Sequence, residues 1–350
     1  QPAGRKRAGK KRKRNEGMRK SHWIGLGAVG LGAGAVHVLL PGMVERRQNR
    51  LLDHEPYRVG EEARRLHASI PVADLHSDAL LWRRDLTRRS SRGHVDFPRL
   101  REGGVALQVF SSVTHGPSRH AYGQDLERPD LITALAVVQG WPPWAWTSYF
   151  RRAMHQARRL RRFQEKSGGQ VRWVRTRADL EAVLAERTVG RDTLGAVFGT
   201  EGCHALEGDL EKLDRLYGAG LRVLGLHHFI DNELGGSLHG ATGGGLTDFG
   251  VDVVQAADER GIILDLAHAS PRVVRDVLSV SAEPVLLSHG GLRSVCDSPR
   301  NLDDDLMVEV AARGGLVGIG YWDAAVCDIT PEGVVHSIRH AIDLLGVDHV

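Results

Sequence analysis

Seven short apolar runs recur between residues 71 and 321, and helical patterns separate most of them. Each run is a nearly continuous stretch of strand-forming residues, which is typical of parallel strands covered on both faces. The runs cover residues 71–75, 105–110, 194–200, 221–226, 261–267, 284–288 and 315–321. The clearest helical patterns cover residues 177–187, 209–220, 250–261 and 331–346. This succession predicts an α/β fold of the (β/α)8 TIM-barrel type.

The main alternative is an open, doubly wound sheet. No GxGxxG sequence follows the first apolar run, and this absence weakens the dinucleotide-binding form of that fold. A barrel over residues 71–350 would begin its eighth strand at Val350, where the chain ends. We therefore expect the last strand to be truncated and the chain to be a piece of a longer protein.

A longer segment, residues 128–175, separates the second and third apolar runs. It contains the sequence GWPPWAWTSYF, followed by a basic helical pattern over residues 151–163. So many arginines on one helix predict a solvated face, and contact with a membrane surface is the alternative.

The N-terminal part of the chain differs in composition from the rest. Residues 1–20 contain ten Lys or Arg and one Glu, so this basic tail carries +9, whereas the other 330 residues carry −5. Residues 23–44 carry no formal charge, and 22 residues are enough to cross a bilayer as a helix. This order predicts a transmembrane anchor or signal segment over residues 21–45 and a lead-in helix or linker over residues 46–70. A glycine-rich buried hairpin is the alternative for the apolar segment.

The excess of positive charge before the apolar segment predicts a cytoplasmic N-terminus and a barrel outside the membrane, in the periplasm or the extracellular space. Export after signal cleavage is the alternative. A basic tail also suits nucleic acid, but the apolar segment directly after it argues against that partner, and we expect none. The oligomeric state is open, and a homodimer is one candidate assembly.

Residues able to bind metal follow five of the first six apolar runs. In a barrel of parallel strands all carboxyl ends open onto one mouth, so these side chains are expected to meet there. One histidine at a strand end is most often structural, but repetition at successive ends is not expected of independent structural residues. The candidates are His76 and Asp78 after the first run, Glu201 after the third, His227 and His228 after the fourth, His268 after the fifth and His289 after the sixth.

Imidazole and carboxylate groups suit zinc or another first-row divalent ion. They are too many for one tetrahedral ion, and they suit two ions about 3.5–4 Å apart that share a carboxylate and a water. His76 and Asp78 would hold one ion, His268 and His289 the other, and Glu201 would bridge them. The bridging water would lose a proton near neutral pH and act as the nucleophile. We therefore predict two divalent metal ions as cofactors, with zinc as the first candidate.

Six motifs make the chain similar to a known family. They are DLHSD, GTEG, LGLHHFIDNELGGS, LDLAHAS, VLLSHGG and SPRNLDDD, and they occur between about residue 71 and the end of the chain. Their order resembles that of the membrane (renal-type) dipeptidases, a branch of the amidohydrolase-like barrels. The resemblance implies a binuclear zinc hydrolase of dipeptides that often tolerates a D-residue at the C-terminal position.

The resemblance also implies roles for single residues. The family's metal ligands correspond to His76, Asp78, Glu201, His268 and His289. The histidine that stabilises the tetrahedral oxyanion corresponds to His228, with His227 as the competing assignment. Asn232, four residues after His228, is a further candidate for binding substrate.

The arginine that binds the substrate carboxylate in the family corresponds to Arg300 in SPRNLDDD. A guanidinium group can bind a carboxylate with two parallel hydrogen bonds. A salt bridge within the loop, from Arg300 to Asp303 or Asp304, is the alternative.

One implied feature has no counterpart here. The family carries a proton-shuttle aspartate after the eighth strand, and Asp348 comes before the point where that strand would begin. We expect this chain to bind metal but to hydrolyse dipeptides poorly. Two alternatives stay open: another metal-dependent amidohydrolase, such as an N-acyl amino acid deacylase or a lactonase, and a non-catalytic metal-binding barrel.

The three cysteines, Cys203, Cys296 and Cys327, form no CxxC motif, and three cannot all pair. We expect Cys203 to be a small buried apolar residue. Asp265 is expected to be structural, because alternation along a strand points it away from His268.

Overall fold

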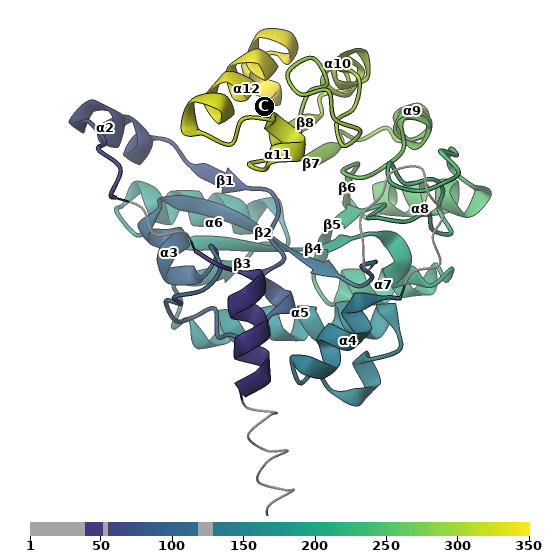
Figure 1. Cartoon of the computed structure of the whole chain (residues 1–350), viewed down its shortest axis with the longest axis horizontal. Coiled ribbons are helices and arrows are strands. Elements are labelled where there is room, and N and C mark those ends of the chain that lie inside the picture. The colour runs from purple at the N-terminus through teal and green to yellow at the C-terminus, as the bar shows by residue number, and fades with distance from the viewer. Residues whose placement is uncertain (1–38, 52–54, 118–128) are drawn as a thin grey trace, which may run out of the picture.

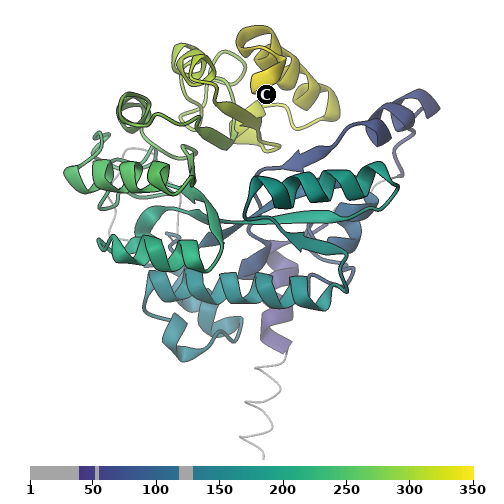
Figure 2. The ribbon, with the colours of Figure 1, turned by 180° about the vertical axis from the view of Figure 1, so that it is seen from behind.

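The computed structural model describes residues 39–51, 55–117 and 129–350, and its strand pairings are all parallel. The sheet has the strand order β1-β2-β4-β5-β6-β7-β8, and β3 pairs with β4 beside this path. The strands are β1 (Val72–Asp74), β2 (Val105–Val113), β3 (Val171–Trp173), β4 (Leu194–Glu201), β5 (Leu221–Gly225), β6 (Ile263–Asp265), β7 (Leu286–Gly290) and β8 (Leu316–Ile319). The sheet curls into a half-barrel with helices around its outside (Figures 1 and 2).

All seven predicted strands are present, so the prediction of a barrel-type α/β fold is confirmed. β1 and β8 are the ends of the sheet, and no strand follows β8 in the described part of the chain. The unpredicted strand β3 pairs with the first residues of β4, with Val171 opposite Leu194. β5 pairs with the same edge of β4 nearer its carboxyl end. It escapes sequence analysis because it has three residues, of which only Val171 is buried.

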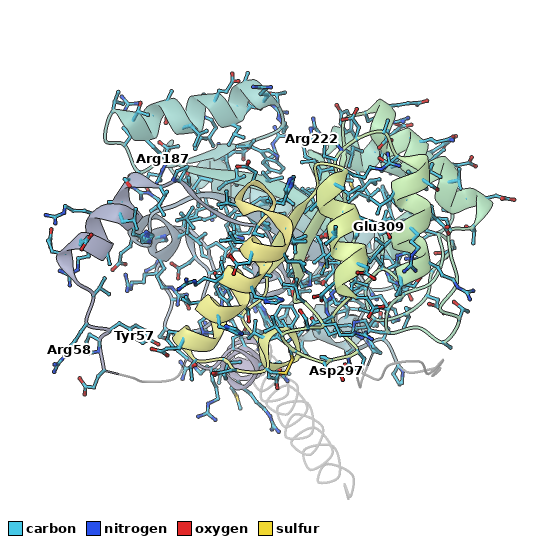
Figure 3. All side chains as sticks on the ribbon, turned by 90° about the horizontal axis from the view of Figure 1, so that it is seen from above. Tyr57, Arg58, Arg187, Arg222, Asp297 and Glu309 are labelled. Atoms are coloured by element: carbon cyan, nitrogen blue, oxygen red, sulfur yellow. A yellow bond between two sulfur atoms is a disulfide. The ribbon has the colours of Figure 1, made fainter. Side chains whose placement is uncertain are left out.

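Helices connect the strands and cover the sheet. They are α2 (Glu61–Ser69), α3 (Phe97–Glu102), α4 (Leu131–Val138), α5 (Tyr149–Lys166), α6 (Arg177–Thr188), α7 (Glu211–Gly218), α8 (Asp248–Glu259), α9 (Pro271–Val280), α10 (Asp304–Ala312), α11 (Asp323–Val326) and α12 (Pro331–Leu345). The four predicted helices correspond to α6, α7, α8 and α12, and α2 lies in the predicted lead-in region. α12 packs beside α10 (Figure 3).

Local signals explain where several helices begin. Thr176 and Asp179 form a reciprocal capping box at the start of α6. Ser270 caps α9, and Pro271 occupies its first turn, where a missing backbone N–H costs nothing.

The main hydrophobic core lies between the sheet and the surrounding helices. Every residue of β4 is buried, as expected for a central strand covered on both faces. Phe198 of β4 packs in the same cluster as Leu213 of α7 and Val253 of α8. This packing holds the strand that ends in Glu201.

The prediction of a solvated face for the basic helix is wrong for two of its arginines. Arg152 and Arg159 of α5 are 1% and 7% exposed. Arg152 forms a 2.5 Å ion pair with Asp130, and Arg159 donates to Leu80 O at 2.5 Å and to Trp82 O. Because a buried guanidinium must keep its hydrogen bonds, these contacts fasten α5 to the barrel.

Residues 39–48 form a helix that we call the N-terminal helix. Its Glu45 is 1% exposed and pairs with Arg84 at 3.0 Å and with Arg92 at 3.5 Å. The last part of the predicted membrane segment therefore packs against the barrel. The basic tail 1–20 and the earlier part of that segment lie outside the described residues. Within the described residues, we find no helix with both the length and the apolar character needed to span a bilayer.

Cys296 and Cys327 form a disulfide that the sequence did not predict. It joins the loop after β7, which carries Arg300, to the end of α11. Closing a loop over 31 positions contributes about 3–4 kcal/mol in the chain-entropy description. Cys203 is free and fully buried, as predicted.

Candidate metal centre

The five predicted metal ligands meet at the carboxyl ends of the strands. His76 and Asp78 follow β1, Glu201 is the last residue of β4, His268 follows β6 and His289 lies in β7. Glu201 Oε1 lies 3.2 Å from Nε2 of His268 and 3.6 Å from Nε2 of both His76 and His289. Parallel strands place all their carboxyl ends on one side, which is why residues so distant in the chain converge.

The ligand atoms form overlapping groups around Glu201. His76 Nε2 lies 3.1 Å from Asp78 Oδ1, and the ligand atoms of these two residues and Glu201 all lie within 4.8 Å of one another. Nε2 of His268 and Nε2 of His289 are 3.0 Å apart, and both are near the same Glu201 oxygen. This geometry is compatible with two ion positions that share Glu201.

The centre gathers buried groups whose pKa values are shifted, and a divalent cation would change their protonation. Burial raises the pKa of Glu201 to about 8, and the charge of Asp78 acts in the same direction. Burial alone would lower the pKa of His76, but Glu201 and Asp78 raise it to about 10. Burial keeps the pKa values of His268 and His289 well below the usual value, so both imidazoles are neutral. His268 and His289 thus already have the neutral form that binds zinc, and a divalent ion would displace the protons that Glu201 and His76 hold without it, so the donor set fits such an ion.

Three of the imidazoles also have a side-chain partner on their second ring nitrogen. Ser111 Oγ lies 3.2 Å from His76 Nδ1, His239 Nε2 lies 2.9 Å from His268 Nδ1, and Ser288 Oγ lies 2.8 Å from His289 Nδ1. Such contacts fix the orientation and tautomer of metal-binding histidines. None of the three partners was predicted, because neither residue type nor spacing marks a serine or a loop histidine as a partner.

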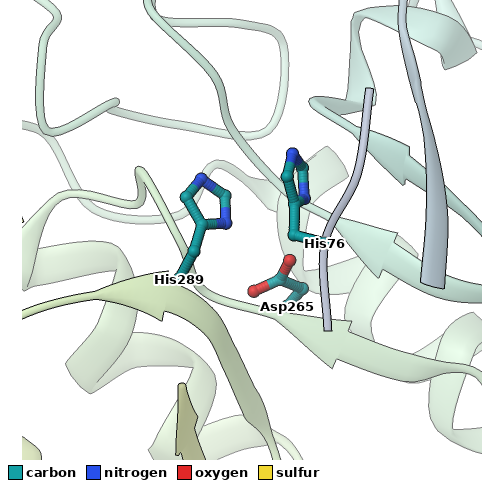
Figure 4. A group of neighbouring side chains, drawn as sticks. All are labelled: His76, Asp265 and His289. Carbon is teal, nitrogen blue, oxygen red and sulfur yellow. The ribbon is translucent and has the colours of Figure 1, made fainter. Parts of the chain in front are cut away.

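Asp265 ends β6 and lies between His76 and His289 (Figure 4). Its carboxylate accepts hydrogen bonds from Ser288 N at 2.9 Å, from Ser288 Oγ at 2.5 Å and from Ala267 N at 3.1 Å. These bonds agree with a structural role for Asp265, but its ligand atom also lies within 4.8 Å of those of His76 and His289, so the three residues form a further group that could hold an ion. Through the Ser288 hydroxyl, Asp265 also supports the orientation of His289.

The backbone of His268 lies in the left-handed region, with φ of 66°. This conformation is uncommon for a residue with a side chain. The carbonyl of His268 accepts hydrogen bonds from Leu238 N at 2.7 Å and Ser237 Oγ at 3.3 Å, which hold the turn. Strain of this kind persists where the surroundings impose it, often at functional sites.

Of the two adjacent histidines, His228 faces the centre. Its Nε2 lies 3.4 Å from Glu201 Oε2, and its Nδ1 lies 3.0 Å from His115 O. His227 is fully buried and does not line the cavity over the centre. The structure therefore favours His228 over the competing assignment.

Asn232, the further candidate for substrate binding, does not line this cavity. Its Nδ2 donates to Leu226 O at 2.8 Å, and its Oδ1 accepts from Leu234 N at 2.9 Å. In this structure the amide of Asn232 shapes the loop after β5, and its role in binding substrate stays a prediction.

Arg300 is 4% exposed and lines the cavity. Its Nη2 donates to His289 O at 2.7 Å, and its guanidinium lies 5.4 Å from the centre of the Trp322 ring. Asp303, one of the two acids considered as partners of Arg300, pairs with Arg293 at 3.4 Å. Arg300 is therefore positioned beside the metal centre, in a cavity of about 990 Å³.

A curled parallel β/α sheet with imidazoles and carboxylates at the carboxyl ends of its strands defines a metal-binding protein of the β/α-barrel class. The sequence model of one family, "Membrane dipeptidase (Peptidase family M19)", matches residues 60–350. The chain belongs to this membrane dipeptidase family.

Curated relatives of the chain carry dipeptidase names. Dipeptidase 3 of Mus musculus is 28% identical over 288 residues, which are 74% of this chain and 49% of the relative. An uncharacterised dipeptidase of Schizosaccharomyces pombe is 26% identical over 270 residues, 73% of this chain and 59% of the relative. The chain thus spans about half to three fifths of the length of these two relatives.

Solved structures share the fold. Dipeptidase AC, a metallopeptidase of family M19, has 25% identity and a TM-score of 0.65, with 81% of this chain and 84% of that chain covered. A metallopeptidase from Rhodobacter sphaeroides, bound to a phosphinate mimic of the dipeptide L-Ala-D-Ala, has 25% identity and a TM-score of 0.63. That comparison covers 80% of this chain and 84% of the other.

Replacing Ser288 by alanine is expected to lower zinc affinity by about ten- to hundredfold, because His289 loses the hydroxyl that links it to Asp265. Competition with a chromophoric chelator measures this affinity. Ser279→Ala, which removes an exposed hydroxyl on α9, is the matched control and should leave it unchanged. Equal affinities for the two variants would show that Ser288 does not support the centre.

Proposed function

We propose that the protein hydrolyses the peptide bond of dipeptides with the help of two divalent metal ions, with zinc as the first candidate. The observation that carries this proposal is the position of Glu201, with three imidazoles within 3.6 Å of one oxygen, in the cavity that Arg300 also lines. The dipeptidase names of the relatives and the dipeptide mimic bound to the Rhodobacter sphaeroides metallopeptidase support it.

His76, Asp78 and Glu201 would hold one ion, and Glu201, His268 and His289 the other. When bound, such ions supply Lewis acidity and lower the pKa of water, so that hydroxide is available near neutral pH. The protein's own contribution is to keep both sets of ligands oriented from outside, through the side chains that contact their second ring nitrogens.

His228 is proposed to stabilise the oxyanion that forms when the peptide carbonyl is attacked. The carbonyl of His115 can only accept, so His228 carries a proton on Nδ1 and turns Nε2 to the cavity. Burial lowers the pKa of His228 well below its usual value, so the imidazole is neutral before the reaction, and Nε2–H would donate to the oxyanion once the ring takes up a proton as negative charge develops there. A donor in this role contributes about 3–4 kcal/mol to lowering the barrier.

The test is a substrate panel on the full chain after zinc loading and after treatment with a chelator. Metal-dependent hydrolysis of L-Ala-D-Ala, with little activity on an N-acetyl amino acid or a lactone, supports the proposal. A preference for either of those substrates favours another amidohydrolase. Binding of zinc without hydrolysis of any of the three, and without binding of a phosphinate dipeptide mimic, favours a non-catalytic barrel.

Arg300 is proposed to bind the C-terminal carboxylate of the substrate. Arg300→Lys keeps the charge but loses the planar pair of donors, so kcat/KM for L-Ala-D-Ala is expected to fall by about ten- to hundredfold. The same change should hardly affect L-Ala-D-Ala amide, which has no carboxylate. Arg293→Lys, in the same loop and paired with Asp303, is the control. An equal loss for acid and amide substrates would argue against carboxylate recognition.

We propose that the protein is attached to a membrane by its N-terminal segment, with the barrel on the outer side. The support is the uncharged stretch that starts at Trp23 and continues up to the N-terminal helix on the barrel, with more positive charge before it than after it. Extraction of membranes with alkaline carbonate tests attachment, and protease treatment of intact cells tests the side. Release of the barrel in soluble form outside the cell would instead favour signal cleavage.

A further inference from the structure

The cavity over the metal centre has an apolar wall that the proposed reaction does not use. We define this wall by six residues that line the cavity: Val44, Leu81, Trp82, Leu131, Leu135 and Val138. They come from the N-terminal helix, the turn after β1 and helix α4. Among the described residues that line the cavity, the acids and bases other than histidine are Asp78 and Glu201 of the metal centre and Arg300.

Helix α4 has one buried apolar face and one more open apolar face, which meet at the cavity: Ile132 of the buried face also lines it, and Leu135 packs against the buried cluster. Ile132 and Ala136 are buried in a core cluster with Leu81 and Val113. Leu131, Leu135 and Val138, spaced i, i+4 and i+7, form another face and line the cavity. Leu131 is 48% exposed. An apolar helix face that the protein leaves open beside a reactive centre is typical of a ligand-binding surface.

The wall is held in place by polar contacts behind it. Val44 is followed by the buried Glu45, which pairs with Arg84 at 3.0 Å. Gln139, directly after α4, donates to Pro41 O of the N-terminal helix at 3.3 Å and accepts from Arg83 N at 2.9 Å. These contacts join the three segments of the wall, so its shape is largely formed before a substrate arrives.

The order of strands places the wall across the mouth from Arg300. Arg300 belongs to the loop after β7, whereas the wall follows β1 and β2, and β4, β5 and β6 lie between them in the sheet. A dipeptide with its carboxylate at Arg300 and its peptide bond at the metal centre therefore extends its N-terminal residue toward the wall.

We propose that the apolar wall binds the side chain of the N-terminal residue, so that the protein selects dipeptides with a large apolar residue at that position. This inference rests on the proposed dipeptidase function. A leucine side chain would be removed from water when it packs against these apolar groups. This should raise kcat/KM by about ten- to hundredfold over a side chain that gains nothing there. A carboxylate or an ammonium group would lose water without gaining an opposite charge from the six residues of the wall, which disfavours it further.

The test compares L-Leu-D-Ala, L-Asp-D-Ala and L-Lys-D-Ala, which share the C-terminal residue. With the zinc-loaded full chain, kcat/KM for L-Leu-D-Ala is expected to exceed the other two by about tenfold or more. Titration calorimetry with the phosphinate mimics of the same three dipeptides gives a readout that does not depend on turnover, and the same order of affinity is expected.

Leu135→Asp tests the wall itself. This variant is expected to weaken binding of the leucine mimic by about tenfold or more, with a clearly smaller effect on the lysine mimic. Val137→Asp is the matched control, because Val137 lies on the same helix, is 44% exposed and does not line the cavity. Thermal unfolding of both variants separates a local effect from loss of the fold.

The outcomes separate this inference from the proposed function. Metal-dependent hydrolysis of all three dipeptides at similar rates, or equal binding of the three mimics, would overturn the inference and leave the dipeptidase function standing. Absence of hydrolysis together with absence of mimic binding would overturn the dipeptidase function, and the inference with it.

Discussion

Glu201→Gln is expected to abolish dipeptide hydrolysis and to leave the protein unable to retain two metal ions per chain. One Glu201 oxygen lies within 3.6 Å of His76, His268 and His289, so both proposed ion positions depend on it. An amide carries no negative charge, and its nitrogen cannot act as a metal ligand. Loss of outer partners of a metal site costs about ten- to hundredfold, so loss of a shared ligand should lower kcat/KM by more than about a hundredfold.

The measurement is the ratio of metal to chain by elemental analysis, together with kcat/KM for L-Ala-D-Ala. Glu207→Gln is the matched control, because Glu207 follows shortly after Glu201 but bonds to Ser148 and Lys212 away from the metal centre. The control should keep two ions and full activity. A Glu201→Gln variant that still holds two ions would show that Glu201 does not bridge them.

Arg152→Met is expected to destabilise the protein by about 3–5 kcal/mol, although Arg152 is not one of the predicted metal ligands. Its guanidinium is 1% exposed and donates to Asp130 Oδ2, Thr133 Oγ1 and the carbonyls of Thr114, Ala145 and Trp146. Methionine fills similar space but leaves these acceptors without a donor, and the Asp130 carboxylate without its counter-charge. Urea-induced unfolding measures the loss as a lower midpoint at unchanged slope.

Arg151→Met is the control, because the side chain of Arg151 is exposed on the same helix and its replacement should change stability by less than about 0.5 kcal/mol.

The effect of Arg152→Met should also depend on pH. Burial opposes ionisation of Asp130, but the hydrogen bond and charge of Arg152 outweigh it and lower the pKa of that carboxyl. An acid with a lowered pKa stabilises the fold above its ordinary pKa and loses this effect as the pH falls. The difference between wild type and Arg152→Met should therefore shrink in acid. Equal midpoints for Arg152→Met and Arg151→Met would show that the buried pair contributes nothing.

Much of the candidate site could be predicted from the sequence because parallel strands impose a simple rule. Five of the first six apolar runs end near a residue whose side chain can bind metal, and the carboxyl ends of the strands share one mouth. His76, Glu201 and His289 could be placed together on this basis, and the structure brings Nε2 of each histidine to 3.6 Å from Glu201 Oε1. Strand direction alone is enough for such a prediction.

Contacts that depend on packing could not be predicted. Ser288, His239 and Ser111 support the ligands through single hydrogen bonds, and their residue types are common everywhere in proteins. A short strand such as β3 carries too few apolar residues to show a period. The burial of Arg152 was missed because a run of arginines does not reveal which of them faces acceptors.

The amino-acid sequence by itself determined the order of strands and helices, the family and the residue types at the strand ends, because these follow from local patterns and from direction along the chain. Only the tertiary structure decided which of His227 and His228 faces the cavity, that Asn232 shapes a loop, that Cys296 pairs with Cys327 and that α4 leaves an apolar face open beside the metal centre. These outcomes depend on side chains from segments far apart in the chain, and their relative positions exist only once the sheet has curled and the helices have packed against it.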